Sequence, residues 1–511
     1  MGARTMPSSK RAIFMSSSDA THEDAPDLEG AADGGNAVAV RPPPSRPTPP
    51  RPADRVRVLL PLSLTIAAGI AVVLPATLPA PARIALFAVL LAIILWSTTS
   101  LDVAYVGLGA ALLLLLTGVS PQERLFDSLA SDVIWLMIGA FILGGAVEQS
   151  GLAMRLAQRV IERARTVRGL FWFLTAVLIP SSLFVPSVSG RAVIAIPIFR
   201  SISSITADPR ITRALALLFP TVILVSTIGS LVGAGSHLVA NQLLSQVTGH
   251  RLSFGEWVLY GMPFGMVASG AACAVIMALF LDGERRGRRI RVPRRPRGSL
   301  SRSERITLAV GATMVVLWLS ERWHGYESAT VTLAGALALT APGSALRWKE
   351  GVKSVDWNLL LFVGAALVLG GALIDTGASG WLFQALLRHS GIESARGRLF
   401  LVVAVGVMSL TSHLYLTSHV ARIVALGPVL LQLAADRALD PAAVVFIGTV
   451  GIDYCLTFPV SSKALLMFQG LDGETFRPAD LLLLSAVMLP IHLALIAVFH
   501  FTYWRWMGLA P

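Results

Sequence analysis

The residues with the clearest chemical potential stand together inside an apolar stretch that runs from 169 to 205. They are Ser187, Ser189, Gly190 and Arg191. A charged side chain inside a membrane segment is costly, so it usually faces a cavity and serves a function there. The planar guanidinium group grips carboxylate or sulfate oxygens two at a time, and hydroxyl groups can add hydrogen bonds. The stretch therefore predicts the binding of a small anion.

The same pattern returns in the second half of the chain, at Ser418, His419 and Arg422. In each copy the first Ser is followed by Arg four residues later, by Val six later and by Pro ten later. A Ser/Gly break makes a non-helical tip, which membranes tolerate only where protein or water satisfies the backbone. We interpret the two copies as halves of one substrate site made of Ser187, Ser189, Arg191, Ser418, His419 and Arg422. A structural alternative stays open, in which the arginines pair with a carboxylate such as Asp453 or cap hairpin carbonyl groups.

The composition places these residues in a membrane protein. Of 511 residues, 54% are hydrophobic and 14% are charged, whereas a soluble domain carries about a quarter charged residues. The mean hydropathy is +0.69, and apolar runs long enough to cross about 30 Å of hydrocarbon recur along the chain. The net charge of +12 comes from basic clusters between these runs, which is typical of cytoplasmic loops and not of nucleic-acid binding. Cys273 and Cys455 fall in apolar segments, so neither a disulfide framework nor a metal site is predicted, and no cofactor is expected.

The apolar runs predict an all-α polytopic membrane protein in four parts. Residues 1–55 form a Pro/Arg-rich tail, expected to be a disordered cytoplasmic extension. Residues 56–282 hold the first transmembrane half and 306–505 the second, joined by a basic cytoplasmic connector over 283–305. An amphipathic basic piece that begins at Arg155 is expected along the cytoplasmic interface. Spans are expected near 58–78, 82–98, 102–118, 132–149, 211–247 (interrupted), 254–281, 306–322, 327–341, 357–376, 440–470 (interrupted) and 479–503, with one broken hairpin whose arms are about 168–186 and 190–205 and another at about 398–435.

The two halves repeat one order of elements. In each half a Gly-rich span precedes a re-entrant helical hairpin, over about 168–205 and about 398–435, and an interrupted span follows it. With the tail and the connector both cytoplasmic, one extra span and five crossings per repeat give about 11 transmembrane helices, and the repeats lie inverted. The substrate site then falls near the midplane, where the repeats meet. Small residues also let helices pack closely, and the matched glycines are Gly144, Gly145, Gly151, Gly370, Gly371 and Gly377.

Motifs along residues 80–503 are similar to those of one transport family. The matching pieces are 133–152, 187–189, 230–237 with Asn241, 356–377, 418–420 and 459–463. They resemble the paired Gly-rich spans, the Ser-Asn-Thr hairpin signatures and the polar breaks of the divalent anion:sodium symporters, within the ion transporter superfamily. The resemblance implies a small anionic substrate and a homodimer. It also implies a cation site, or its basic replacement, at Gly233, Ser236, His237, Asn241, Pro459, Ser461 and Lys463.

The departures from the family pattern bear on the coupling ion. Both signature asparagines are replaced, by Val188 and His419, the asparagine of the first break is His237, and Lys463 stands at a usually neutral position. Sodium prefers hard oxygen donors, and a fixed cation at roughly 4 Å repels it by about 4 kcal/mol at an effective dielectric near 20. We therefore expect little sodium dependence, with anion exchange, or proton coupling through a histidine, in its place.

Together these features predict a secondary active transporter. It carries a small divalent anion, whether dicarboxylate, citrate or sulfate, by alternating access across the plasma membrane, the inner membrane in a bacterium. Its N-terminus is expected in the cytoplasm, and Na⁺ and H⁺ both remain open as coupling ions. The alternatives are an arsenite- or proton-coupled carrier of the same superfamily, and a membrane sensor. An enzyme is not expected, because the sequence lacks H-E-x-x-H and Ser189 lacks the G-x-S-x-G frame.

Overall fold

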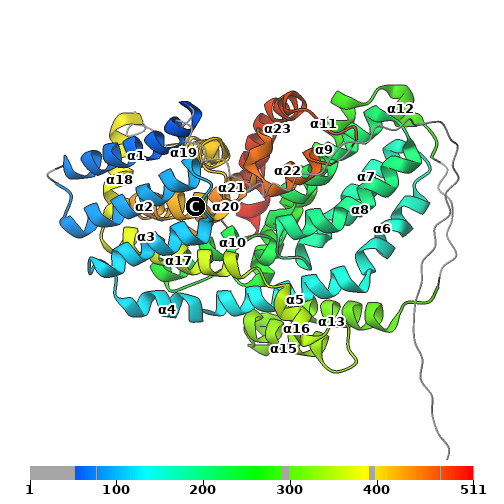
Figure 1. Cartoon of the computed structure of the whole chain (residues 1–511), viewed down its shortest axis with the longest axis horizontal. Coiled ribbons are helices and arrows are strands. Elements are labelled where there is room, and N and C mark those ends of the chain that lie inside the picture. Colours follow the sequence, from blue (N-terminus) through cyan, green and yellow to red (C-terminus); the bar gives the residue numbers. More distant parts are fainter. Residues whose placement is uncertain (1–51, 76, 291–297, 391–396, 472, 510–511) are drawn as a thin grey trace, which may run out of the picture. The chain divides into compact units, whose positions relative to one another are not determined.

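The computed structural model describes residues 52–509, except 76, 291–297, 391–396 and 472 (Figure 1). Pro52–Pro511 forms one compact unit of packed helices. The predicted tail over 1–55 lies almost wholly outside the described residues, and so does the middle of the basic connector.

The first half contains the two elements that carry the first Ser/Arg motif and the first polar break. Labels with η mark short 3-10 or π turns. The elements are α1 (Pro52–Val73), α2 (Ala80–Thr98), α3 (Val103–Leu116), α4 (Gln122–Ala130), α5 (Asp132–Ser150), α6 (Leu152–Arg163), α7 (Val167–Leu178), η1 (Ile179–Leu183), α8 (Val188–Thr206), α9 (Pro209–Val225), η2 (Thr227–Gly229), η3 (Leu231–Gly233), α10 (Gly235–Thr248), α11 (Phe254–Phe280) and α12 (Gly283–Gly287).

The second half follows the same order around the second Ser/Arg motif. Its elements are α13 (Arg302–Leu319), α14 (Glu321–His324), α15 (Ser328–Thr340), α16 (Trp348–Lys353), α17 (Trp357–Asp375), α18 (Ala378–Ser390), α19 (Arg398–Thr411), η5 (Ser412–Leu414), α20 (His419–Asp436), α21 (Pro441–Asp453), η6 (Pro459–Ser461), α22 (Lys463–Gln469), α23 (Pro478–Phe499) and η7 (His500–Trp504).

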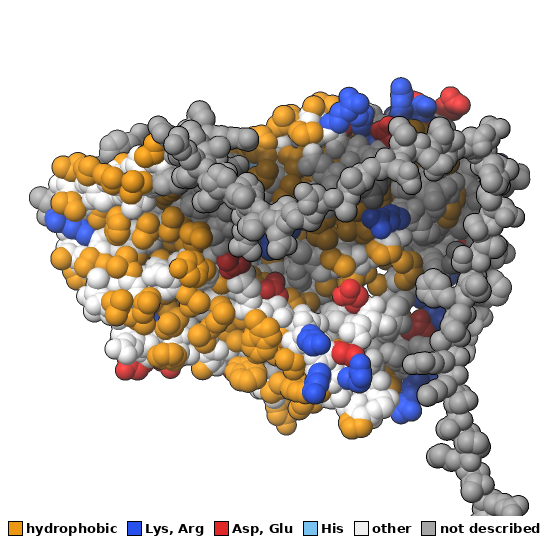
Figure 2. Space-filling model, in the orientation of Figure 1, with side chains coloured by type: hydrophobic (Ala, Val, Ile, Leu, Met, Phe, Trp, Pro, Cys, Tyr) orange, Lys and Arg blue, Asp and Glu red, His pale blue; other side chains and the backbone are white. Residues whose placement is uncertain are grey.

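The predicted all-helical membrane fold is confirmed. Within the described ranges, seven helical stretches are long and apolar enough to cross a membrane, and shorter apolar helices accompany them. Figure 2 shows apolar side chains over the face formed by α1, α2 and α3, where Tyr105 and Leu116 are among the exposed residues. The number of about 11 crossings and the inverted relation of the repeats remain predictions.

Local sequence signals set the same boundaries in both halves. Asp208 caps α9 and Asp440 caps α21, each with a proline at the first helical position, where the missing N–H costs nothing. Just before each of these caps stands an alanine whose backbone is in the left-handed conformation, Ala207 (φ 46°) or Ala438 (φ 50°). Non-glycine residues rarely adopt this conformation, so its appearance at both turns shows that the hairpins and the interrupted spans are joined alike.

The elements of the two halves interlock where the chain is broken. Helix α10 packs against α20 and α21, whereas α22 packs against α8 and α9. Each interrupted span therefore contacts the hairpin of the other half, and Figure 1 shows α10, α20 and α21 together near the middle of the view. The matched glycines permit other close contacts between the halves: an added Cβ on Gly370 of α17 would lie 2.8 Å from a Leu243 methyl group of α10, and one on Gly145 of α5 would lie 2.6 Å from Ser354 Oγ.

The basic connector is fastened to the base of the first hairpin. Val167 N donates to Arg288 O, and Ile290 N donates to Arg165 O. Asp208, the cap of α9, accepts from both Arg285 and Arg288. The connector therefore begins as an ordered segment.

Candidate functional site

The two predicted hairpin tips have the same local structure. Ser187 Oγ accepts from the backbone N–H of Gly190, and Ser418 Oγ accepts from that of Ala421. Each serine is thus the N-cap of a long helix, α8 or α20, whose N-terminus favours negative charge. A capping hydroxyl keeps its own hydrogen, so both serines can still donate to a ligand. Ser189, the second residue of α8, is half-buried.

Arg191 is buried and is held by the first break. Its Nη2 donates to Thr227 Oγ1 at 2.5 Å, and its Nη1 lies 3.4 Å from Ser226 Oγ. Among the described residues no acceptor contacts its Nε. A guanidinium group offers five N–H donors, and neutral hydroxyls occupy only part of them. Arg191 therefore keeps donors available for an anion.

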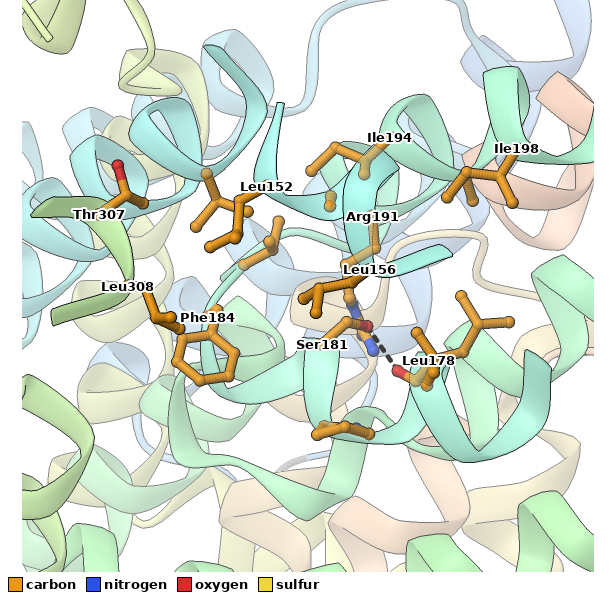
Figure 3. A pocket seen from close by; sticks show the side chains of 16 residues that line it. Leu152, Leu156, Leu178, Ser181, Phe184, Arg191, Ile194, Ile198, Thr307 and Leu308 are labelled. Carbon is orange, nitrogen blue, oxygen red and sulfur yellow. Dashed lines mark hydrogen bonds between the residues drawn. The ribbon is translucent and has the colours of Figure 1, made fainter. Parts of the chain in front are cut away.

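A cavity of about 160 Å³ opens beside Arg191. It lies between α5, α6, the first hairpin and α13, and Arg191 is its one charged lining residue. Figure 3 shows the Arg191 side chain directed toward Ser181, with Leu156 and Leu178 beside it. The rest of the lining is almost entirely apolar, which strengthens any charge interaction made there.

Arg422 is also buried, yet its surroundings differ. Nε donates to Leu416 O at 2.8 Å and Nη2 to Thr417 O at 3.0 Å, both in the hairpin tip. Nη1 donates to Ile452 O at 2.7 Å and Nη2 to Ser461 O at 3.3 Å, on either side of the second break. The structure thus gives Arg422 the role of a carbonyl cap, the alternative left open from sequence.

Two of the three replaced asparagine positions, His237 and His419, meet at one carboxylate. His237, in α10, lies with Nε2 2.7 Å from Asp453 Oδ2 and with Nδ1 2.8 Å from Ser230 O. His419, the first residue of α20, lies with Nδ1 3.7 Å from Asp453 Oδ1 and Nε2 3.3 Å from Cys455 Sγ. Arg191 and Arg422 both interact electrostatically with Asp453. Basic groups from both halves therefore converge on Asp453.

The other predicted cation-site residues have different individual surroundings. Asn241 is bound at both ends of its amide by the backbone of Leu252. Gly233 shapes the first break, since a Cβ there would lie 2.2 Å from Thr227 O. Ser236 and Ser461 are buried with hydroxyls that have no partner in the described chain. Pro459 is buried at the start of η6, whereas Lys463 is exposed at the start of α22.

Sequence reasoning missed two parts of this site. Asp453 was noted only as a partner for arginine, and Ser226 and Thr227 were not singled out. An acid within an apolar run is itself a functional signal in a membrane segment, and Asp453 stands directly before the second break, as Thr227 stands in the first. The approach of Asp453 to His237 could not be read from the sequence, because it depends on how the halves interlock.

Comparisons with known proteins fit this architecture. A family profile described as "Citrate transporter" matches residues 91–451 and 322–509. The chain belongs to the citrate transporter family. The predicted resemblance within the ion transporter superfamily is thereby confirmed.

The relatives and structural neighbours include proteins named as transporters. A "Sodium-dependent dicarboxylate transporter SdcS" of Staphylococcus aureus is 22% identical over 403 residues, covering 72% of this chain and 76% of the relative. A "Membrane protein" of Cupriavidus necator is 26% identical over 396 residues, covering 74% and 76%. The crystal structure of the Alcanivorax borkumensis YdaH transporter shares the fold, with a TM-score of 0.52 and 14% identity over 85% of this chain and all of that one. This citrate transporter family protein is therefore a multi-pass membrane transporter and not an enzyme.

Proposed function

We propose that the protein carries a small di- or tricarboxylate across the plasma membrane by alternating access, with little dependence on sodium. The observation that carries the proposal is the buried guanidinium of Arg191, which is held by two hydroxyls and keeps donors free beside a cavity. A planar fork of this kind binds a carboxylate with two hydrogen bonds. Ser187 and Ser418 at the helix N-termini, with Ser189, are proposed as further donors for the anion, although none of the three lines this cavity.

The surroundings of Arg422 support the low sodium dependence. Carbonyl oxygens from a hairpin tip and from a polar break are the hard donors that a sodium ion needs. In the second half, four such oxygens already accept hydrogen bonds from Arg422. A second cation about 4 Å from this charge is repelled by about 4 kcal/mol. Arg422 thus stands in place of a mobile cation, although the Staphylococcus aureus relative is named as sodium-dependent.

A fixed charge also favours exchange over net transport. It attracts the anion as a bound cation does, but it cannot leave with the substrate. The empty carrier then holds two buried guanidinium groups, Arg191 and Arg422, beside the single carboxylate of Asp453, and this excess of positive charge is costly. Reorientation with a second anion bound avoids that cost, so anion exchange is the faster mode.

Transport by reconstituted protein tests the function. Proteoliposomes take up labelled succinate or citrate, faster with internal counter-substrate, and replacing sodium by choline alters the rate less than about twofold because the site keeps its own cations. Labelled sulfate distinguishes the remaining anion class. Arg191→Ala abolishes uptake, and Arg191→Lys keeps the charge but loses the fork. A steep sodium dependence with a Hill coefficient above one contradicts the proposal.

Orientation and assembly belong to the same proposal. The basic connector and the N-terminus face the cytoplasm, as the arginine distribution indicates, and the carrier is a homodimer, as its resemblance implies. Both native cysteines are buried, so in Ser299→Cys the thiol reagent labels only the introduced cysteine. An impermeant thiol reagent reaches it in inverted vesicles and not in intact cells. Labelling from outside, or a monomeric mass in detergent, would contradict these assignments.

A further inference from the structure

The contact between His237 and Asp453 joins the two interrupted spans inside the protein. Their side chains are 0% and 3% exposed, and Nε2 lies 2.7 Å from Oδ2. The other ring nitrogen, Nδ1, lies 2.8 Å from Ser230 O. Both nitrogens of one imidazole ring therefore face oxygen atoms at hydrogen-bond distance.

The hydrogen-bond pattern fixes the number of protons in this pair. Ser230 O is a carbonyl oxygen and can only accept, so Nδ1 carries a hydrogen. Asp453 Oδ2 at 2.7 Å requires a second hydrogen between it and Nε2. That hydrogen belongs either to an imidazolium facing a carboxylate or to a carboxylic acid facing a neutral ring. In both cases the pair holds one proton more than a neutral histidine beside an ionised aspartate.

His413 provides the contrast. Its Nδ1 also lies against a carbonyl oxygen, Leu410 O at 2.5 Å, but its Nε2 lies 2.6 Å from Thr457 Oγ1. A hydroxyl can donate, so Nε2 accepts and the ring is satisfied while neutral. The extra proton is thus a property of the His237 and Asp453 pair and not of every buried histidine in this fold.

The surroundings suit a proton that enters and leaves. Trp257, whose ring centroid lies 5.1 Å from that of His237, offers a π-face that favours a cationic ring. Asp453 Oδ1 and His419 Nδ1, 3.7 Å apart, have no hydrogen-bond partner among the described residues. At 14% exposure, the His419 side chain is the most accessible of the three. The other titratable or charged groups that face the pair are Arg191 from α8, Arg422 from α20, Cys455 beside the second break and His492 from α23.

We infer that His237 and Asp453 form a proton-binding site, loaded through His419, which supplies the coupling ion of the carrier. This inference rests on the proposed transport function. One proton passes from solvent to His419, from its Nδ1 to Asp453 Oδ1, and is then held between Oδ2 and His237 Nε2. The loaded pair is neutral, and the empty pair carries one negative charge.

Loading changes the force between the interrupted spans. In the empty pair the ring carries one hydrogen for two acceptors, so either the lone pair of Nε2 faces Asp453 or the lone pair of Nδ1 faces Ser230 O, and one of the two contacts becomes repulsive. In the loaded pair both contacts are hydrogen bonds. Proton binding therefore tightens the junction of the first break, α10 and the end of α21, which links the proton to the arrangement of the two halves.

The test compares Asp453→Asn with His413→Gln in proteoliposomes. In the wild type, an inward gradient of about one pH unit raises succinate or citrate accumulation by up to about tenfold, and a protonophore abolishes the gain. In Asp453→Asn the amide N–H donates to Nε2 without a titrating proton, so this variant keeps the contact and folds. It loses the response to the pH gradient, measured as the ratio of accumulation with and without the gradient, which falls to unity whatever the basal rate of this variant. His413→Gln keeps the pH response.

The other possible results distinguish a failure of the proposed function from a failure of the proton site. Absence of exchange in the wild type overturns the proposed function itself. Exchange without any pH response in the wild type overturns only the proton site. An unchanged response in Asp453→Asn, or an equal loss in His413→Gln, also overturns it. As an independent readout, infrared difference spectra on acidification show a histidine or carboxyl protonation band in the wild type that Asp453→Asn lacks.

Discussion

Arg191 and Arg422 stand at the same place in two copies of one motif, yet their partners differ in kind. Arg191 contacts two hydroxyl groups, whereas Arg422 donates to four backbone carbonyl oxygens. Hydroxyl groups can reorient as a ligand arrives, but the carbonyl network occupies four of the five N–H donors of Arg422 and leaves no pair of donors for a bidentate ligand. A repeated motif in a membrane protein therefore need not mean a repeated function: one copy can bind the substrate while the other holds the framework.

Removing each arginine gives the largest expected effects and tests this comparison directly. Arg422→Ala leaves several buried carbonyl groups without donors, at a total cost of at least about 3 kcal/mol, so the purified protein unfolds at a much lower temperature. Arg191→Ala stays folded but loses the rise in melting temperature that substrate gives. The measurement is thermal unfolding in detergent with and without citrate or succinate. Similar behaviour of the two variants would remove the distinction.

The first break provides the next test, because it supplies the hydroxyls that hold Arg191. In Gly233→Ala the new Cβ lies 2.2 Å from Thr227 O, so the backbone that presents Thr227 must shift. We expect uptake to fall at least as far as in Arg191→Lys. Gly109→Ala, which meets no atom within 4 Å, is the matched control in uptake assays. Normal uptake by Gly233→Ala would show that Arg191 does not need this break.

A smaller effect is expected at Asn241, which the family resemblance placed in the cation site. Its amide binds the backbone of Leu252 at 2.8 and 2.9 Å. Asn241→Ala should therefore lower stability by about 1–2 kcal/mol and leave the response to sodium unchanged. Gln242→Ala, the neighbouring control, should change neither. A variant whose stability is normal but whose cation response is altered would return Asn241 to the cation site.

The smallest effect is expected at Glu304, which forms an ion pair with Arg155 at 2.6 Å and so joins the two halves. Glu304 precedes residue 306, where the predicted span begins. The Ser301 backbone N–H, and also Arg155, hold the pKa of this carboxyl below its usual range. Because the folded pKa is depressed, the stabilisation is present above the unfolded value of about 4.3 and is lost as the pH falls toward the folded pKa. Glu304→Gln removes it at all pH values, by about 1 kcal/mol. We propose to measure unfolding of the two proteins between about pH 3 and about pH 7. Their stabilities should converge at the acid end, whereas a constant difference at every pH would exclude the linkage.

Much of the fold could be predicted from the sequence because its signals are local. Apolar length gives the helices, Asp-Pro pairs give the starts of α9 and α21, and the spacing of Ser187 and Ser418 from their arginines gives both tips. The identity of each arginine's partners is not local. Arg422 meets carbonyls that the sequence cannot mark, since every residue has one. His237 and His419 were recognised as departures, but their common partner, Asp453, emerges only when α10 packs against α20 and α21.

The four bonds of Arg422 have a mechanical consequence. They tie Leu416 and Thr417 at the hairpin tip to Ile452 and Ser461 at the break. Pulling these segments apart would strand a charge and four carbonyls away from water, so they move as one rigid body. Helices α20 and α21 are also joined at their other ends by the left-handed turn at Ala438, so the two helices are held together at both ends. A movement of this half therefore carries the tip and the break together, as one block, relative to the first half.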